Sequence, residues 1–454
     1  MGKIASISYA GHSIFNESQI DITNEKTFSS ENYITLLIGE NGSGKSELLK
    51  SIVQFYRRDH VDSNIWSKMN ITQTGITKRT SWPQKIIAYS LSINDKFPYQ
   101  KNKWDGKESY FYAGLKTTSN TIYIGKYRED LFKCFYLTSM NESKEELLLN
   151  CLEFMGLPTR FQFKLTLGSN FYRHLSRQGE NSNVTSIVQS FIDGRPPRKD
   201  KDLDASRLVD NHQALTLIAD FVSSFYIGEH HQLDLNINVI KKNDNNKNNT
   251  ELMKLLILLI DNKILSISEF NEISQSDFIN LSSGQFNLIR NIATLASQLV
   301  DDALVIIDEP EISLHPSWQI KYMDLIKSVL SKFKGCHAIV ASHSHLLATS
   351  LPTKNANVII SKNVDGISIN PFEASPTGWS SDMILYGVFG VLTRGNAAFE
   401  NDLRTVSSLL NDINITNLKK IQEALSRLDR YALPSNDPLT TFLKKAKEKI
   451  KDFK

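Results

Sequence analysis

Gly39-Glu40-Asn41-Gly42-Ser43-Gly44-Lys45-Ser46 is the stretch that decides the fold of this 454-residue chain. It fits the pattern G-x-x-x-x-G-K-[ST], a loop whose backbone N–H groups close around phosphate groups. The apolar run 34–38 predicts a buried strand before it, and 47–56 predicts a helix after it. Because a helix N-terminus favours negative charge, this order of elements predicts a nucleotide-binding α/β core.

The loop residues have distinct expected roles. Lys45 would reach the terminal phosphates of a nucleotide, and the Ser46 hydroxyl group would ligate Mg²⁺. Glycines leave the backbone free to curl around the phosphate oxygens. The residues expected to contact the nucleotide are Gly39, Asn41, Gly42, Ser43, Gly44, Lys45 and Ser46.

An apolar strand that ends in two carboxylates follows much later in the chain. Residues 303–307 are Ala-Leu-Val-Ile-Ile, a composition typical of a buried parallel strand, and Asp308 and Glu309 come directly after them. We expect this strand to deliver both carboxylates to the C-terminal edge of the sheet. Asp308 would hold Mg²⁺ there, and Glu309 would polarise the attacking water.

Two further motifs flank this strand. The stretch Leu281-Ser282-Ser283-Gly284-Gln285 differs from LSGGQ at one position, and Asp308 follows Ser282 by 26 positions (308 − 282). Downstream, the apolar run 338–342 predicts another buried strand, which presents His343 at its end. A histidine at that point can hydrogen-bond a terminal phosphate and report whether the phosphate is present.

Taken in this order, the four motifs resemble those of ATP-binding-cassette (ABC) ATPases. The resemblance implies an α/β fold, namely an ABC-type P-loop ATPase head with a small antiparallel β lobe, a helical lobe and a helical C-terminal region. It implies ATP and Mg²⁺ as cofactors, with Ser46 and Asp308 as the metal ligands. It also implies that Glu309 and His343 are the catalytic residues.

One phosphate loop and one signature motif per chain imply a site shared between subunits. In this superfamily the two elements complete each other across a dimer interface, so we expect a head-to-tail homodimer or a higher homo-oligomer. The signature residues that would contact ATP held by the other subunit are Ser282, Ser283, Gly284 and Gln285. Closure would place donors around the transferring phosphoryl group.

The residues from Asp308 to Pro316, Asp-Glu-Pro-Glu-Ile-Ser-Leu-His-Pro, narrow the resemblance. They are similar to the DEPExxLHP form of RecF-like, OLD-like and SMC-like ATPases, and His315 stands where a transporter's D-loop has aspartate. Pro316 suits the first turn of a helix predicted over 317–330.

Two less specific stretches of sequence resemble a narrower group within these ATPases. Residues 86–98 and 378–391 are similar to segments of the PtuA-type ATPases of bacterial Septu antiphage systems and of retron-linked ATPases. The general ATPase resemblance extends to about Ser361. OLD-family nucleases have a strand ending in Glu-Gly after the histidine that corresponds to His343. This sequence has no such strand. Any nuclease of the pathway would therefore be another protein.

The sequence departs from the family pattern after the predicted strand that begins at Ile86. The loop there should carry a glutamine that senses Mg²⁺, but Gln84 precedes the strand instead. Asn94 and Asp95 are the alternatives for this role, and the choice between them stays open. Candidates for the aromatic ring that stacks on adenine are Tyr9 and Phe15.

The composition of the chain limits the classes of protein to which it can belong. The chain is 41% apolar and 22% charged, with three cysteines that lack metal-ligand spacing, which favours reduced thiols and a cytoplasmic location. No apolar run reaches about 18 residues, so no membrane span is predicted. The net charge of +3 is too small to indicate nucleic acid, although the basic clusters 195–199 and 444–451 leave contact with DNA or RNA open. His230 and His231 are expected to be a surface pair.

Four segments are expected. Residues 1–143 would hold the N-terminal part of the ATPase core with the phosphate loop and the β lobe, the latter over 82–126 after a polar loop over 59–79. Residues 144–280 would form the helical lobe and 281–370 the C-terminal part of the core. A helical C-terminal region, 371–454, would dock a partner through Trp379, Phe389 and Phe399.

Two functions follow from the resemblance. The first is an ATP-binding and ATP-hydrolysing regulatory subunit of an antiphage defence complex, which controls an HNH-type nuclease resembling PtuB through nucleotide-dependent dimer closure. The alternative is a RecF-like DNA-binding ATPase that acts in repair without a nuclease partner. The sequence leaves open which nucleic acid is attacked and whether ATP activates or restrains the partner.

Overall fold

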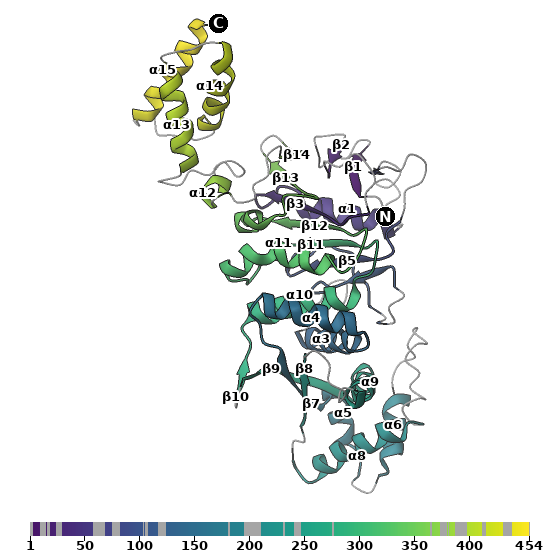
Figure 1. Cartoon of the computed structure of the whole chain (residues 1–454). Coiled ribbons are helices and arrows are strands. Elements are labelled where there is room, and N and C mark those ends of the chain that lie inside the picture. The colour runs from purple at the N-terminus through teal and green to yellow at the C-terminus, as the bar shows by residue number, and fades with distance from the viewer. Residues whose placement is uncertain are drawn as a thin grey trace.

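The computed structural model has the predicted α/β fold class, with a parallel sheet at its centre (Figure 1). It describes residues 3–9, 15, 19–23, 30–57, 69–74, 82–102, 104, 108–116, 124–179, 182–194, 210–229, 232–239, 247–274, 277–363, 366–372, 379, 381–385, 397–410, 415–429 and 438–453. The basic cluster 195–199, the pair His230-His231, Phe389 and most of the run 378–391 lie outside these ranges. Among the helices within them, none combines the length and apolar character needed to cross a membrane.

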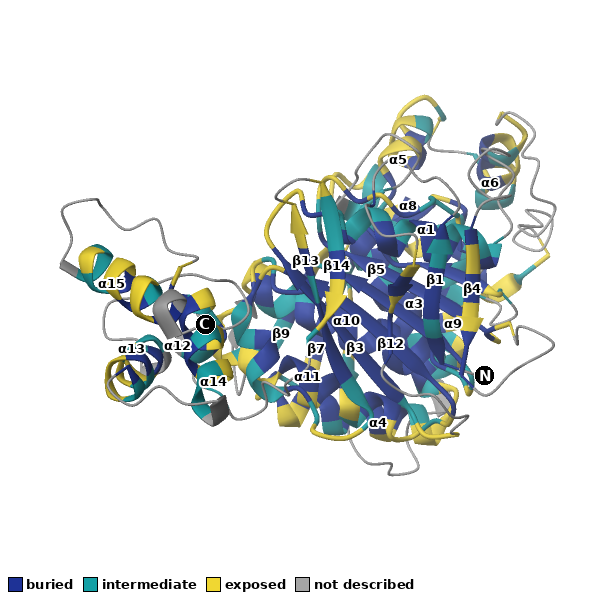
Figure 2. Cartoon of the chain, turned by 90° about the horizontal axis from the view of Figure 1, so that it is seen from above, coloured by how far each residue is buried: buried dark blue, intermediate teal, exposed yellow. Residues whose placement is uncertain are grey.

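Seven strands form the central sheet in the order β14-β13-β3-β12-β11-β5-β6, and all neighbours are parallel except β13 and β14. Every residue of β3, β5, β11 and β12 is buried, as expected for strands covered on both faces (Figure 2). The strands are β3 (Tyr33–Gly39), β5 (Ile86–Ser90), β6 (Tyr110–Tyr112), β11 (Leu304–Asp308), β12 (His337–Ser342), β13 (Ala356–Asn363) and β14 (Ile367–Pro371).

Strand register brings the distant motifs to one edge of this sheet. Asp308, the last residue of β11, pairs with Ala341 of β12 and Ser90 of β5. Ser342, the last residue of β12, pairs with Ile38 of β3. The segments that follow these strands therefore start side by side. They are the phosphate loop, the loop that begins with Glu309 and the segment that begins with His343.

A separate three-stranded antiparallel sheet has the order β2-β1-β4, with β1 (Ile4–Tyr9), β2 (Gln19–Asp21) and β4 (Met69–Gln73). Helix α1 (Lys45–Arg57) joins it to the central sheet, because its apolar residues share one core cluster with residues of β1 and β4 and with β11 and β12. The prediction of a polar loop over 59–79 is therefore wrong for β4, whose alternating burial had no apolar run to reveal it. The antiparallel prediction for 82–126 is also wrong, since β5 and β6 are parallel.

The lobe expected to be helical also contains a four-stranded antiparallel sheet, β10-β9-β7-β8, which the sequence analysis missed. Its strands are β7 (Arg160–Leu167), β8 (Leu233–Asn238), β9 (Leu265–Ser274) and β10 (Asp277–Asn280). The helices are α3 (Ile124–Ser139), α4 (Glu142–Phe154), α5 (Ser169–Leu175), α6 (Val184–Asp193), α8 (His212–Tyr226) and α9 (Lys247–Asp261). The polar faces of β7 and β8 interrupt their apolar pattern, which is why local periodicity did not reveal them.

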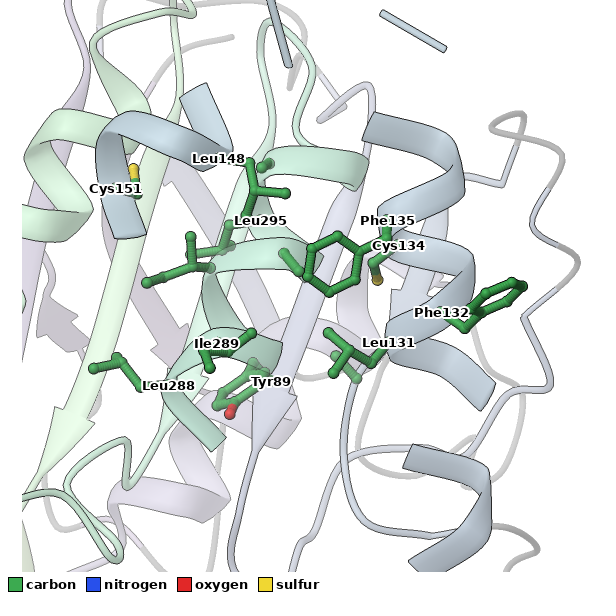
Figure 3. Packing of buried hydrophobic residues seen from close by; sticks show 14 of the residues in the cluster. Tyr89, Leu131, Phe132, Cys134, Phe135, Leu148, Cys151, Leu288, Ile289 and Leu295 are labelled. Carbon is green, nitrogen blue, oxygen red and sulfur yellow. The ribbon is translucent and has the colours of Figure 1, made fainter. Parts of the chain in front are cut away.

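Helix α10 (Ser283–Gln298), which begins in the signature motif, connects this lobe to the core. Its residues Leu288 and Leu295 belong to the same buried cluster as Leu131 of α3 and Leu148 of α4 (Figure 3). Tyr89 of β5 belongs to this cluster too, and its hydroxyl group donates a 3.2 Å hydrogen bond to a carbonyl oxygen of α10. A displacement of the signature motif would therefore be transmitted to the central sheet through the contacts of α10.

The C-terminal helices form a small bundle with its own core, at one end of the molecule in Figure 1. They are α13 (Ala397–Leu409), α14 (Ile415–Leu428) and α15 (Pro438–Phe453). The Arg427 guanidinium group donates to both oxygens of Asp402, at 2.8 and 2.7 Å, and so joins α14 to α13. The short helix α12 (Ser381–Ile384) contacts α13 on one side and the 3₁₀ helix η2 (His345–Ser350) on the other.

A buried polar network links three neighbouring strands of the central sheet, β12, β3 and β13. The Ile4 backbone N–H group donates to Nδ1 of His337, which leaves Nε2–H of the same ring to donate to Thr35 Oγ1, 3.0 Å away. Thr35 in turn donates to Asn357 Oδ1 at 3.0 Å. His337 is fully buried, and burial, with a smaller contribution from Lys3, lowers its pKa from 6.5 to about 3.

This histidine predicts an acid-sensitive fold. The unfolded chain takes up a proton on His337 below about pH 6.5, whereas the folded chain resists it down to about 3, so His337 lowers the free energy of unfolding as pH falls through that window. Between about pH 6.5 and 5 the loss should be roughly 2 kcal/mol. Urea unfolding should show this loss in the wild type and in His212→Gln, whose histidine is exposed, but not in His337→Gln. Equal acid sensitivity of all three proteins would contradict the assignment.

Candidate nucleotide-binding site

A pocket of about 590 Å³ opens at the C-terminal edge of the central sheet. Its volume lies within the range usual for small-molecule and cofactor sites. The residues that line it come from the phosphate loop, the start of α1, the loops after β5 and β11, the residue after β12 and the start of β14. They are Asn41, Gly42, Ser43, Gly44, Lys45, Ser46, Glu47, Ser92, Asn94, Lys96, Glu309, Ile312, His343 and Ile367.

Two glycines of the phosphate loop have left-handed backbone conformations. Gly42 and Gly44 have φ values of 76° and 90°, which side chains rarely tolerate. A Cβ atom on Gly44 would also lie 2.8 Å from Ile367 Cδ1. Lys45 Nζ donates to the carbonyl oxygens of Gly39 and Glu40, at 2.8 and 2.7 Å, so the ammonium group lies inside the curl of the loop.

Strand β13 braces the loop from outside the pocket. Ser361 donates to the Ser43 carbonyl oxygen, and Asn363 Nδ2 donates to the Gly42 carbonyl oxygen at 3.3 Å. A Cβ atom on Gly39 would lie 2.2 Å from the Ser361 carbonyl oxygen. Glycine at position 39 is therefore required by a neighbouring backbone, a reason the sequence pattern alone does not give.

Electrostatics at the floor of the pocket suit a phosphate-bound divalent cation. Asp308 is buried, and desolvation raises its pKa to about 7, with Glu309 adding to the effect and the hydrogen bond to Ser46 opposing it. Asp308 Oδ1 is buried and has no hydrogen-bond partner among the described residues. Burial lowers the pKa of Lys45, and the negative charge of Glu309 works against this. Ser46 and Asp308 thus fit Mg²⁺, a hard cation that prefers oxygen ligands.

The backbone at Glu309 is strained. This residue has a φ of 52°, held by a 2.9 Å hydrogen bond from its N–H group to the Ala341 carbonyl oxygen of β12. Left-handed conformations at non-glycine residues cost of order 1 kcal/mol or more and concentrate at functional sites. The turn aims the residue at the pocket, where its side chain lies among the lining residues. This geometry is consistent with the predicted role of Glu309 toward the attacking water.

Glu311 is a site residue to which the sequence analysis gave no role. It is buried, and its Oε1 atom accepts from Ser342 Oγ at 2.7 Å and from the His343 N–H group at 2.8 Å. The same oxygen lies 3.0 Å from His343 Nδ1. The signal was present in the sequence as an acidic residue just after a fully apolar strand, but its partner lies on another strand and only the fold brings them together.

The signature residues are not among the described residues that line this pocket. Ser282 is exposed and caps helix α10, accepting from the Gln285 N–H group at 3.2 Å while Gln285 Oε1 accepts from the Ser282 N–H group at 2.9 Å. Gly284 packs so closely on the loop after β11 that a Cβ atom would lie 2.3 Å from the Ser313 carbonyl oxygen. The structure therefore joins the signature to its own D-loop rather than to its own phosphate loop.

The structure separates the two alternatives for the missing glutamine. Asn94 lines the pocket, whereas Asp95 is buried and is not among the lining residues, although its charge acts on Asp308. The Asp95 carboxylate accepts from the Tyr112 hydroxyl group at 2.5 Å and from the Phe97 N–H group at 2.8 Å. Asn94 is therefore the better placed of the two for a role toward a bound metal ion. Lys96, which also lines the pocket, is paired with Glu47 at 3.2 Å.

Neither candidate for adenine stacking lines the pocket. Tyr9 and Phe15 are buried and stack on each other, with ring centroids 5.3 Å apart. The Tyr9 hydroxyl group is hydrogen-bonded to Ser51 Oγ of α1 at 2.9 Å. Tyr9 therefore supports α1, and the Phe15 ring lies against the phosphate loop, where a Cβ atom on Gly44 would be 3.3 Å from Phe15 Cε1. The stacking role stays a prediction.

Comparison with known proteins gives a partial family match. Residues 138–349 match the family described as "AAA domain, putative AbiEii toxin, Type IV TA system". The chain is 22% identical over 379 residues to the retron Vc95 probable ATPase of Vibrio cholerae, covering 74% of this chain and 70% of that protein. It is 28% identical over 146 residues to the Septu protein PtuA of Bacillus thuringiensis, covering 32% and 35% respectively.

Other matches are more distant or partial. Protein ea59 of Escherichia phage lambda is 26% identical over 324 residues, which are 70% of this chain and 47% of that protein. Among solved structures, an SMC head bound to a winged-helix domain of ScpA has 11% identity and a TM-score of 0.28, covering 82% of this chain and 98% of that chain. An ADP-bound cassette of an ABC transporter has 10% identity and a TM-score of 0.30, covering 83% and 93%. The fold class rests on the sheet topology described above.

The pocket geometry predicts that Lys45 dominates nucleotide affinity. Replacing it by alanine removes a buried ammonium group that would otherwise donate charge-assisted hydrogen bonds to phosphate oxygens. The Kd for Mg²⁺ and a non-hydrolysable ATP analogue, measured by titration calorimetry, should rise about 10- to 100-fold. Lys254→Ala, which changes an exposed lysine of α9, is the matched control and should bind as the parent does. Equal affinity of both variants would refute this site.

Proposed function

We propose that this chain, an ABC-like ATPase related to the Septu protein PtuA, is the ATP-hydrolysing regulatory subunit of a bacterial antiphage defence complex whose nuclease is a separate HNH-type protein. The observation that carries the ATPase part is the meeting of Lys45, Ser46, Glu309 and His343 around one pocket, with Asp308 beneath it. The defence part is supported by the similarity to a retron ATPase and to PtuA.

Each of these pocket residues has its own proposed role in ATP hydrolysis. Lys45 and the loop N–H groups would hold the terminal phosphates, while Ser46 and Asp308 would hold Mg²⁺. When bound, the cation would neutralise phosphate charge and polarise the scissile bond. Glu309 would take a proton from the attacking water, and His343 would donate a hydrogen bond to the terminal phosphate as charge moves onto the leaving oxygen.

The shared site extends this proposal to a head-to-tail dimer. Ser282 and Ser283 are exposed, and they do not line the pocket of their own chain. An exposed helix N-terminus, whose backbone N–H groups and serine O–H groups can donate hydrogen bonds, is suited to phosphate oxygens from a second subunit. Two copies related by a two-fold axis would each place the start of α10 over the partner's phosphate loop, so that closure depends on ATP.

Two substitutions test closure. Glu309→Gln should bind ATP without hydrolysing it, so light scattering after size exclusion should show a monomer that becomes a dimer when ATP and Mg²⁺ are added. Adding Ser282→Arg to this variant should keep the protein monomeric with ATP, because the long cation clashes at the interface. Its own ATP affinity should stay within about threefold of the parent, a difference of under 1 kcal/mol. An ATP-dependent dimer of the double variant would overturn the shared-site proposal.

The C-terminal bundle is the proposed docking region for the nuclease. Trp379 packs against Phe372, with ring centroids 5.7 Å apart, and is partly buried on the main core, whereas Phe399 is partly buried against the core of the bundle. These two aromatic residues are therefore engaged within the chain, and a partner would meet the outer faces of α13 to α15. The bundle is connected to the site through α12, whose Ile384 is fully buried and which contacts η2, the segment just after His343.

Purification of the complex tests the defence role. The tagged chain, expressed from its native locus with ATP present, should co-purify with a small HNH protein, and removing the bundle by ending the chain at residue 396 should abolish this while ATP binding persists. The co-purified complex should cut nucleic acid at a rate that changes with nucleotide. A lone protein that binds duplex DNA when ATP is added would instead support the RecF-like alternative.

A further inference from the structure

The hydrogen bonds around Glu311 determine what His343 can do. The side chain of Glu311 is only 4% exposed, while that of His343 is 44% exposed and faces the pocket. Glu311 Oε1 already accepts from Ser342 Oγ and from the His343 N–H group. An oxygen with two donors that also lies 3.0 Å from His343 Nδ1 acts as an acceptor toward that nitrogen. Nδ1 of His343 therefore carries a proton.

This assignment has a chemical consequence at the other ring nitrogen. In a neutral imidazole only one nitrogen carries a proton, so a proton on Nδ1 leaves Nε2 as an acceptor. The oxygens of a terminal phosphate are acceptors as well. Two acceptors repel each other, and the contact becomes favourable only when Nε2 takes up a second proton and the ring is an imidazolium.

We propose that Glu311 is a positioning residue that holds His343 with its proton on Nδ1 and balances the charge of the imidazolium that donates from Nε2 to the terminal phosphate of ATP. This inference rests on the proposed ATPase function and gives one of its residues a defined protonation state. When the phosphate arrives, Nε2 takes up a second proton from solvent, and when the phosphate leaves, that proton returns to solvent. His343 then distinguishes ATP from ADP by charge as well as by contact.

The surroundings of His343 fit a cationic ring. Glu311 comes from the loop after β11, and Glu309 of the same loop lines the pocket with His343. Lys45 of the phosphate loop is the opposing positive group, and its charge interacts with Glu309, Asp308 and Glu311. Glu311 Oε2 is buried without a hydrogen-bond partner among the described residues, so the negative charge of this carboxylate is neutralised by few donors other than those on Oε1. A buried, under-compensated anion favours a cation beside it.

The direct test is ¹⁵N NMR of the histidine rings in the Glu309→Gln protein, which keeps the Glu311–His343 pair intact. His343 signals are assigned by their loss in His343→Ala. Without nucleotide and with Mg²⁺ and ADP, His343 should show a protonated Nδ1 and an unprotonated Nε2. With Mg²⁺ and ATP both nitrogens should be protonated. An unprotonated Nδ1 without nucleotide, or an unprotonated Nε2 with ATP, would overturn the proposal.

Kinetics of the Glu311→Gln variant provide a second readout. Glutamine keeps the size of the side chain but removes the countercharge, so kcat should fall about 100-fold, within the range usual for lost acid–base assistance, while KM changes less than about threefold. Glu145→Gln, a similarly buried glutamate of α4 outside the site, controls for the loss of a buried charge and should hydrolyse ATP as the parent does. Parent-like kcat in Glu311→Gln would contradict the proposal for Glu311. Absence of ATP binding and hydrolysis in the parent itself would contradict the proposed function instead.

Discussion

The parallel pairing of β3, β12 and β11 is the constraint on which the rest of this structure depends. Each strand is fully buried, and its alternate side chains pack in two different core clusters, so a slip by one residue would move every side chain into the wrong cluster. The register sets Asp308 beside Ala341, and Ser342 beside Ile38. Three segments far apart in the chain thereby reach one edge with fixed spacing.

Burial at that edge creates the electrostatics of the site. Asp308 sits in a low-dielectric floor that raises its pKa to about 7, and the same burial lowers the pKa of Lys45. Charges held in such surroundings act on a bound phosphate more strongly than they would in water. The Glu311 carboxylate is also buried at this edge of the sheet, and its Oε1 atom lies 3.0 Å from His343 Nδ1. The sheet therefore fixes the positions of these groups and also strengthens their effects.

Local sequence was sufficient for the parts of the site whose chemistry is local. The phosphate loop, the strand ending in Asp308 and the strand before His343 were predicted because each motif lies in a single strand and turn. Pairing between distant strands could not be read in this way. The antiparallel prediction for 82–126 failed because the partner of β5 is β11, more than 200 residues later in the chain. Strand β4 and the sheet β10-β9-β7-β8 were missed because their half-polar faces give no continuous apolar run. Glu311 belongs to the same class, since its partners Ser342 and His343 follow another strand.

Subunit complementation measures the central claim, a site completed by a second copy, most directly. Lys45→Ala disables the phosphate loop and Ser282→Arg disables the signature motif, so each variant alone should be inactive. Mixed in equal amounts, they should recover part of the wild-type ATPase rate, at most about a quarter, because an unlike pair holds one intact site of two and the Ser282→Arg side chain obstructs only the other site. If each chain instead used its own signature, every subunit of the mixture would remain defective. A mixture as inactive as its components would contradict the shared site.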